Sequence, residues 1–267
     1  MLKLKRGDIV VRKSYDNDIK FYISKIKEEN HEKIAILKGI TIRIEATAPL
    51  KDLKKIDKKI IEKDIQIVEN KINSRVLESK NSNLSGVYNG TILHLDGDRN
   101  YSKKSYRYYR KLSLNAIVRN IPENKQCVYI KDLLEKYRPD ILVITGHDAI
   151  LKKGLGYHNI NNYRNSANFI KTVKEARKWN PSANGLVIFA GACQSYYEAI
   201  MEAGANFASS PGRILIDFVD PLIVANKIAT TSYLRYVTVD EICKDTTTGR
   251  EGIGGIATRG KQKIAQK

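Results

Sequence analysis

Cysteine is scarce in this sequence, and its distribution excludes two kinds of scaffold. Three cysteines occur among 267 residues, at positions 127, 193 and 243. A disulfide framework needs an even number of cysteines, and a zinc site needs closely spaced pairs. We therefore expect neither, and we expect no metal and no cofactor.

Long hydrophobic runs are also missing. No stretch approaches the roughly 18 consecutive apolar residues that a membrane-crossing helix requires. Residues 1–7 contain neither the apolar segment nor the small-residue cleavage site of a signal peptide. We therefore expect a cytoplasmic protein without a membrane partner. Hydrophobic residues still make up 42% of the chain, which is enough to build a core.

Acidic residues are outnumbered, with 29 aspartates and glutamates against 47 lysines and arginines and a net charge of +18. Such a field attracts nucleic acid or another polyanion. A lysine-rich protein with solvated helix faces has the same excess of charge, and we favour that explanation. The densest basic cluster lies in residues 99–111, where basic residues and tyrosines are interleaved at a helical spacing. Nucleic acid stays an open partner.

The first part of the chain is predicted to be all-β. Short β-branched segments are separated by polar turns at residues 9–11, 21–23, 34–37 and 40–44. They predict a small SH3-like β-barrel over residues 1–54, or an extra sheet on the main domain. Residues 55–85 form a charged segment. A helical rhythm runs through residues 52–71, and residues 72–85 are expected to be an exposed linker.

Residues 86–267 alternate between strands and helices. Strands are predicted at residues 91–95, 116–118, 141–144, 186–189, 207–208 and 214–216. Helices are predicted between them, at residues 99–112, 130–137, 164–179, 195–202, 221–228 and 239–244. This alternation indicates an α/β domain with a mostly parallel sheet flanked by helices.

Two of the predicted strands end in the same pattern. Residues 141–148 and 186–195 each contain four apolar residues, then small residues, then one reactive side chain, which is His147 or Cys193. Neighbouring parallel strands would bring both side chains to one edge of the sheet. An imidazole there raises the thiolate fraction of a thiol. A lone buried cysteine is usually a core residue, but the matching histidine segment favours a catalytic pair.

The residues around this pair predict the rest of the reaction site. Gly191 and Ala192 let the chain turn, so that a substrate carbonyl approaches the backbone N–H of Cys193. That N–H, together with one near Gly146, is the expected donor to an oxyanion.

Residue order distinguishes between families of thiol hydrolases. No histidine follows Cys193, which excludes papain-like and glutamine-amidotransferase-like enzymes. Ser195 stands where an α/β-hydrolase elbow needs glycine. Histidine first and cysteine second, each after a hydrophobic strand, resembles the caspase–legumain–gingipain–separase group, so we expect a caspase-like sheet. In that group a glycine follows the histidine; here Gly146 precedes His147 and Asp148 follows it.

Several blocks of sequence resemble the YabG family of sporulation proteases. The blocks are residues 7–15, 93–98, 137–149, 187–195, 203–211 and 254–260. The resemblance implies an endopeptidase that processes spore coat and other spore proteins and cleaves after arginine or lysine. It also implies a place in the mother cell of a sporulating bacterium, at the forming coat.

A basic side chain before the cut requires an acidic pocket. Asp217 and Asp220 follow the predicted strand 214–216, and we favour them; each is also a natural helix cap. Asp148 is a further candidate for the pocket, or it orients His147. The pair Asp96 and Asp98, which ends the first strand, is another. Ser209 and Ser210 line the same cleft or simply form a turn.

Alternatives to this assignment stay open. His158, in a glycine-rich loop, is a rival base. His94 lies within a predicted strand and is expected to be packed. Self-cleavage is a hypothesis for the exposed basic residues Lys71, Arg75 and Lys80. A basic nucleic-acid or coat-binding protein and a non-proteolytic thiol hydrolase are the competing functions.

Overall fold

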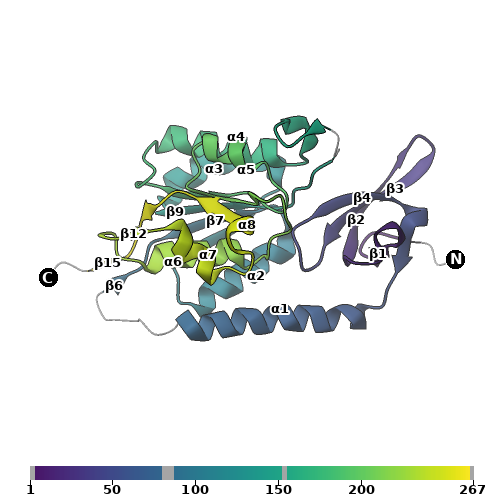
Figure 1. The fold of residues 1–267 in the computed structure, drawn as a ribbon, viewed down its shortest axis with the longest axis horizontal. Coiled ribbons are helices and arrows are strands. Elements are labelled where there is room, and N and C mark those ends of the chain that lie inside the picture. Colours follow the sequence, from purple (N-terminus) through teal and green to yellow (C-terminus); the bar gives the residue numbers. More distant parts are fainter. Residues whose placement is uncertain (1–3, 80–86, 152–154, 265–267) are drawn as a thin grey trace.

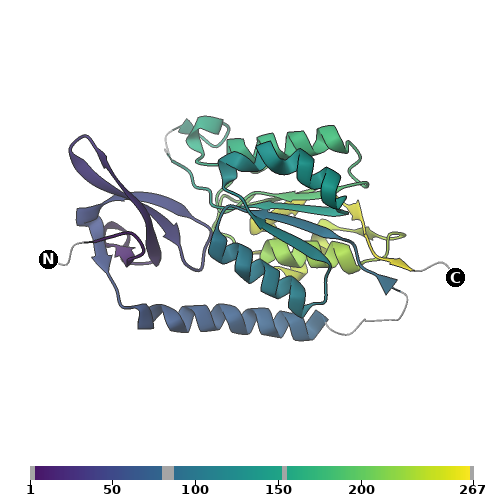
Figure 2. The ribbon, with the colours of Figure 1, turned by 180° about the vertical axis from the view of Figure 1, so that it is seen from behind.

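The structure is a computed structural model that describes residues 4–79, 87–151 and 155–264. An antiparallel sheet lies at one end, an α/β body forms the larger part, and a long helix runs beside both (Figure 1). Figure 2 shows the same arrangement from behind. Among the residues described, no helix combines the length and apolarity needed to cross a membrane.

The N-terminal part is a five-stranded antiparallel sheet. Its strands are β1 (Ile9–Arg12), β2 (Phe21–Glu29), β3 (Glu32–Gly39), β4 (Glu45–Pro49) and β5 (Leu53–Lys55), in the spatial order β4-β3-β2-β1-β5. Alternate residues such as Phe21, Ile23, Ala35 and Leu37 form its core. The prediction of an all-β start is confirmed, and the SH3-like closure stays a prediction.

The strand predicted at residues 40–44 is wrong. The chain leaves the sheet after β3 and returns only with β4. In between, Ile42 and Ile44 form isolated bridges to Asp217 and Asp148 of the α/β body. The apolar residues of this segment therefore contact the α/β body and do not extend the N-terminal sheet.

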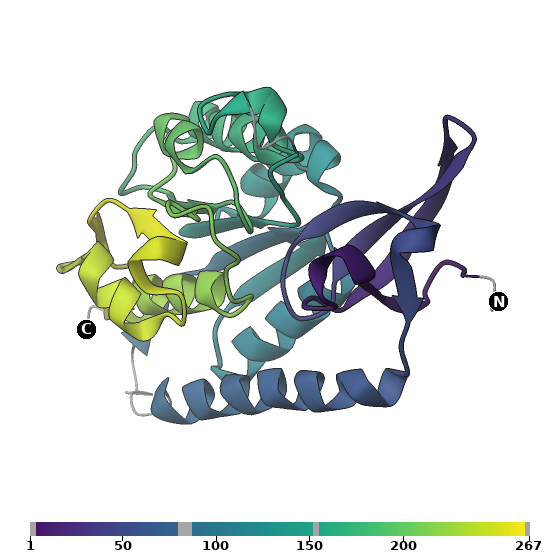
Figure 3. The same ribbon diagram turned by 45° about the vertical axis from the view of Figure 1, so that its right-hand side comes forward.

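Helix α1 (Lys58–Ser79) connects the two parts (Figure 3). Asp64 pairs with Lys20 of the sheet, and Glu69 pairs with Arg107 of the body. The linker predicted at residues 72–85 is wrong up to residue 79, because helix α1 continues to Ser79. Residues 80–85, including the proposed cleavage residue Lys80, lie outside the described residues.

The central sheet has six strands. They are β7 (Ile92–Asp96), β8 (Ala116–Asn120), β9 (Ile141–Thr145), β10 (Val187–Ala190), β11 (Phe207–Ser209) and β13 (Ile253–Gly255), in the order β13-β11-β10-β9-β7-β8. All neighbouring pairs are parallel except β11 with β13. The α/β class and the mostly parallel sheet are confirmed.

Helices cover both faces of this sheet (Figure 1). One face carries α3 (Glu123–Tyr137), α4 (Ser166–Trp179) and α5 (Tyr197–Glu202). The other carries α2 (Arg99–Lys111), α6 (Asp220–Thr230) and α7 (Val239–Asp245). Leu142 packs into one core and Val143 into the other, so the strand is apolar on both sides. In α2, three tyrosines are buried while most of the basic residues face solvent.

Short elements complete the fold. They are the helix α8 (Gly249–Gly252), the pairs β6 (Val87–Tyr88) with β15 (Lys263–Ile264) and β12 (Tyr236–Val237) with β14 (Thr258–Arg259), and the 3-10 turns Lys13–Tyr15, Leu50–Asp52 and Ile160–Asn162. The strand predicted at residues 214–216 is wrong. The sheet edge beside β11 is taken by β13, whose Gly255 pairs with Phe207. Residues 214–216 instead run over the ends of the strands, where Ile216 contacts Cys193.

Candidate active site

Three adjacent strands deliver polar side chains to one edge of the central sheet. Ile144 of β9 is paired with Ala190 of β10 and with Leu95 of β7. His147 follows the end of β9 by two residues, and Cys193 follows the end of β10 by three. Both side chains are fully buried. The register therefore places the predicted pair at the same edge.

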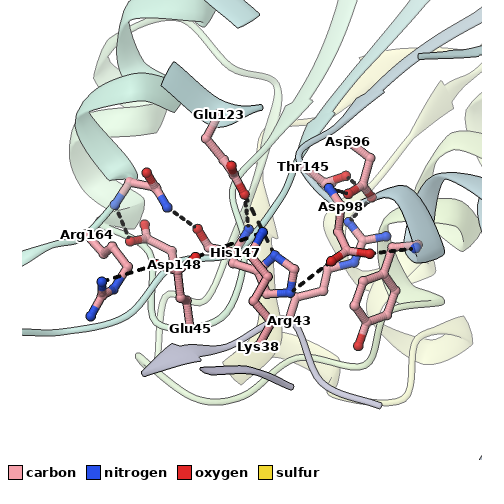
Figure 4. A network of polar contacts seen from close by, with 12 residues as sticks. Lys38, Arg43, Glu45, Asp96, Asp98, Glu123, Thr145, His147, Asp148 and Arg164 are labelled. Carbon is pink, nitrogen blue, oxygen red and sulfur yellow. Dashed lines mark hydrogen bonds and ion pairs between the residues drawn. The ribbon is translucent and has the colours of Figure 1, made fainter. Parts of the chain in front are cut away.

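The imidazole of His147 lies between two carboxylates (Figure 4). Glu123 Oε1 accepts the backbone N–H of His147 at 2.8 Å and lies 3.7 Å from Nδ1. Asp98 Oδ2 lies 4.0 Å from Nε2. In the described part of the chain, neither ring nitrogen has a hydrogen-bond partner. Each ring nitrogen therefore lies near a carboxylate at ion-pair distance and not in a hydrogen bond.

The pKa values of both carboxylates are affected by the neighbouring ring of His147. Burial alone would raise the pKa of Glu123, but its hydrogen bond to His147 and the attraction of the imidazolium hold that pKa below its ordinary value. Burial likewise opposes ionisation of Asp98, and the charge of His147 and a hydrogen bond from Tyr22 lower the pKa of Asp98. The proximity of His147 therefore favours the ionised form of both carboxylates.

Two glycines make room for Glu123. A methyl group added at Gly97 would lie 2.2 Å from the Glu123 carboxylate, and one at Gly146 would lie 2.4 Å from it. Any side chain at these positions would push the carboxylate away from His147. The role that the structure supports for Gly146 is therefore close approach, and its part in binding an oxyanion stays a prediction.

The thiol of Cys193 is held by backbone groups. The N–H of Ile216 donates to Sγ at 3.4 Å, and Sγ lies 3.8 Å from the carbonyl oxygen of the same residue. Burial nevertheless raises the pKa of Cys193 to about 12. Burial therefore favours the neutral thiol over the thiolate.

Asp148 has a structural role in this arrangement. Its carboxylate accepts hydrogen bonds from Asn165 N at 2.7 Å, Ser166 Oγ at 2.5 Å and Ser195 Oγ at 2.9 Å. These bonds tie the histidine loop to the start of α4 and to the cysteine loop. Ser195 Oγ in turn accepts the N–H of Ala192 at 2.9 Å, so that N–H is already engaged.

The other residues predicted to line the pocket lie in turns, at the start of α6 or at the end of β11. Asp220 accepts hydrogen bonds from Thr247 and Thr248, which anchors the α7–α8 turn to the start of α6. Asp217 accepts the N–H of Val219 at 3.0 Å and bridges to residue 42. Ser210 Oγ donates to the carbonyl of Ile214, which is turn chemistry. Ser209 is buried at the end of β11, and its hydroxyl has no hydrogen-bond partner among the described residues.

The remaining histidines have ordinary surroundings. His158 is exposed, and its ring packs edge-on against Tyr196. His94 is buried, as predicted, with its nitrogens bonded to Tyr109 and Thr145. In the described residues, no group of three or more histidine, cysteine or acidic side chains is arranged to hold a metal ion.

The family model of the YabG peptidase U57 matches residues 5–266. The chain belongs to this family. A curated relative, the sporulation-specific protease YabG of Bacillus subtilis (strain 168), is 38% identical over 279 residues, which cover 97% of this chain and 96% of the relative. No solved structure matches the chain. The resemblance to this peptidase family, predicted from blocks of sequence, is thus confirmed.

Sequence reasoning missed two residues at the site of this U57 family member. Glu123 stands at the start of α3 with no local motif, and its only trace in the sequence is the room left by Gly97 and Gly146. Arg43 comes from the N-terminal sheet, and its Nη1 lies 2.9 Å from Asp96 Oδ2. Nothing near Arg43 in the sequence links it to a residue 53 positions later in the chain.

Proposed function

We propose that this chain is a cysteine endopeptidase in which Cys193 is the nucleophile and His147 the general base and acid. One observation carries the proposal: in a member of a peptidase family, the two residues follow adjacent, paired parallel strands at one sheet edge. Glu123 and Asp98 lie on either side of the imidazole, and Glu123 holds the backbone of His147 in place.

The reaction has two halves. Cys193 Sγ adds to the scissile carbonyl carbon while His147 takes the thiol proton, and the backbone N–H of Cys193 donates to the oxyanion. The C–N bond then breaks, His147 returns the proton to the leaving amine, and a thioester remains. Water, deprotonated by His147, adds to the thioester, and the acid product and the thiol are released.

We propose protein substrates of the forming spore, including coat proteins, with cleavage after arginine or lysine in the mother cell. The family assignment and the relative's role in sporulation support this substrate class. The acidic lining of the buried edge, with Asp96 and Asp98 beside His147, supports a basic residue before the cut.

A peptide library that contains arginine, lysine and neutral residues tests this function. Wild type is compared with His147→Ala and Cys193→Ala, and with Cys243→Ala and His158→Ala as matched controls. Loss of either member of a pair that acts as a unit lowers kcat by about 10³-fold or more. Full activity in Cys193→Ala would refute the mechanism, and activity on small esters alone would indicate a non-proteolytic thiol hydrolase.

We also propose that the chain cleaves itself. Of the basic residues considered, Lys71 and Arg75 lie within α1, so cleavage there requires the end of the helix to unwind into an extended peptide. Intact-mass spectrometry of wild type beside Cys193→Ala measures the event. Identical masses for the two proteins after long incubation would exclude it.

A further inference from the structure

Arg43 belongs to the N-terminal sheet by sequence, yet it is fully buried at the catalytic edge of the α/β body. Its guanidinium lies 2.9 Å from Asp96 Oδ2 and 4.9 Å from the centre of the Tyr101 ring. The N–H groups miss hydrogen-bond geometry, so charge and stacking hold the side chain. A fully buried arginine is rare, and it signals a pocket built for a positive charge.

The residues on either side of Arg43 contact both walls of the site. Ile42 forms an antiparallel bridge to Asp217, which directly follows the Ile216 contact of the sulfur. Ile44 forms a parallel bridge to Asp148, which directly follows His147. The N–H of Ile44 also donates to the carbonyl of Ile42 at 2.9 Å, so the chain makes a tight turn at Arg43. The turn thus lies between the cysteine side and the histidine side and is paired with each through one bridge.

The backbone of Arg43 lies at the proposed nucleophile. Its backbone is close enough to the sulfur of Cys193 to lower the pKa of the thiol, and its Nη1 lies 2.9 Å from Asp96 Oδ2. Asp96 is itself fixed by Thr145 Oγ1 at 3.0 Å and by the N–H of Asp98 at 2.8 Å. Arg43 thus holds a basic side chain against an acid next to the proposed nucleophile, which is where the side chain of a basic residue before the scissile bond is needed.

The turn that presents Arg43 is built by local features. The N–H of Gly39 donates to the carbonyl of Ile44 at 2.9 Å. A methyl group at Gly39 would lie 2.3 Å from the carbonyl oxygen of Ile42, so only glycine fits there. Beyond Ile42, a cavity of about 370 Å³ lined by Leu215, Asp217 and Thr248 continues the groove. A longer peptide has room on that side.

We propose that residues 42–44 occupy the substrate groove as a built-in peptide, with Arg43 in the pocket for the residue before the cut and Asp96 as the specificity-determining acid of that pocket. The inference rests on the proposed function and adds Asp96 as the residue that binds the basic side chain of the substrate. In this structure the groove is closed, and a substrate arginine must replace Arg43 at Asp96.

Alkylation of Cys193 by iodoacetamide tests the occupancy. Rates are followed by mass spectrometry of the full chain, and Cys127 and Cys243 serve as internal references. Arg43→Ala is expected to raise the Cys193 rate about tenfold or more, because a smaller closed fraction exposes the thiol in proportion. Arg43→Lys should stay near wild type. Arg12→Ala, which breaks an ion pair on the same sheet, should also leave the rate unchanged.

Thermal melting shows whether each variant is folded. A folded Arg43→Ala protein with the wild-type Cys193 rate would overturn the occupancy, whatever its activity. The alkylation needs no peptide cleavage. A protein that cuts no peptide but shows the acceleration therefore refutes the proposed function and supports the occupied groove.

Peptides test the assignment of Asp96. In the Arg43→Ala background, Asp96→Asn is expected to reduce the ratio of kcat/KM for arginine over glutamine before the cut by about tenfold, as for loss of one buried charge pair. Asp132→Asn, on the exposed side of α3, is the matched control, and its ratio should not change. A ratio that falls with Asp217→Asn and holds with Asp96→Asn would overturn the assignment.

Discussion

Glu123 and Asp148 are both buried carboxylates next to His147, Glu123 in space and Asp148 in the sequence, and they differ in their contacts. Glu123 contacts the backbone and the ring of His147, and the charge of the imidazolium helps to keep the pKa of Glu123 low. Asp148, which directly follows His147 in the sequence, accepts hydrogen bonds from hydroxyl and amide donors, and burial raises the pKa of Asp148 to about 6. Proximity to a proposed catalytic residue in sequence is therefore a poor guide to function. The contacts separate a carboxylate that serves the chemistry from one that holds loops together.

The largest effect is expected from Asp148, on stability. Its pKa is about 6 in the folded protein against 3.8 as the ordinary value. The folded state binds the Asp148 proton more tightly, so the stability that Asp148 contributes is complete below pH 3.8 and is lost as the pH rises through about 6, by up to about 3 kcal/mol. Asp148→Asn removes the titrating carboxyl group and should flatten this slope in urea unfolding from about pH 4 to 7.

The exposed Asp132 on α3 is the control for that experiment. Asp132→Asn should leave the pH dependence of the unfolding free energy as it is in wild type. An unchanged slope in Asp148→Asn would contradict the contrast between the two carboxylates.

Glu123→Gln is expected to act on activity. The substitution replaces the charged acceptor of the His147 backbone N–H by a neutral amide oxygen. Hydrogen bonds to charged groups contribute about 2 kcal/mol, which corresponds to about thirtyfold in kcat. KM should stay the same because Glu123 does not face the proposed groove. Glu135→Gln, on the exposed side of the same helix, is the control. Equal kcat values for the two variants would remove Glu123 from the site.

Ser195→Ala should give the smallest effect. Ser195 Oγ accepts the N–H of Ala192 and donates to Asp148, so its loss leaves a buried amide unpaired and lowers the unfolding free energy by about 1 kcal/mol. Ser182 Oγ accepts the N–H of Gly185 in the same manner, but in an exposed turn. Ser182→Ala should therefore be nearly neutral. Equal losses in the two variants would show that burial around Asp148 is irrelevant.

Local pattern was enough for the parts of the fold in which each residue meets its sequence neighbours. The apolar runs at residues 141–144 and 186–189 are strands, and the side chains that follow them lie at one edge. The pattern failed at residues 214–216, because the place beside β11 went to a strand from much later in the chain. An apolar segment does not by itself show which other segment of the chain will pack against it.

The site was predictable to the same extent. His147 and Cys193 each follow a strong strand signal, whereas Arg43 reaches the site from a different sheet, and Glu123 from the start of a helix. The favoured pocket residue Asp220 proved to anchor a turn, and the less favoured Asp96 meets the buried arginine. Such pairings depend on how two domains dock, and no spacing in the sequence encodes that.

The turn between β3 and β4 is anchored at both ends in one sheet, at Gly39 and Glu45. A segment tethered in this way stays near the groove at an effective concentration on the order of millimolar. Dilute proteins compete poorly against it, while proteins packed in a dense layer reach comparable concentrations. We therefore expect the enzyme to be quiet in dilute solution and to cut most rapidly where its targets are crowded together.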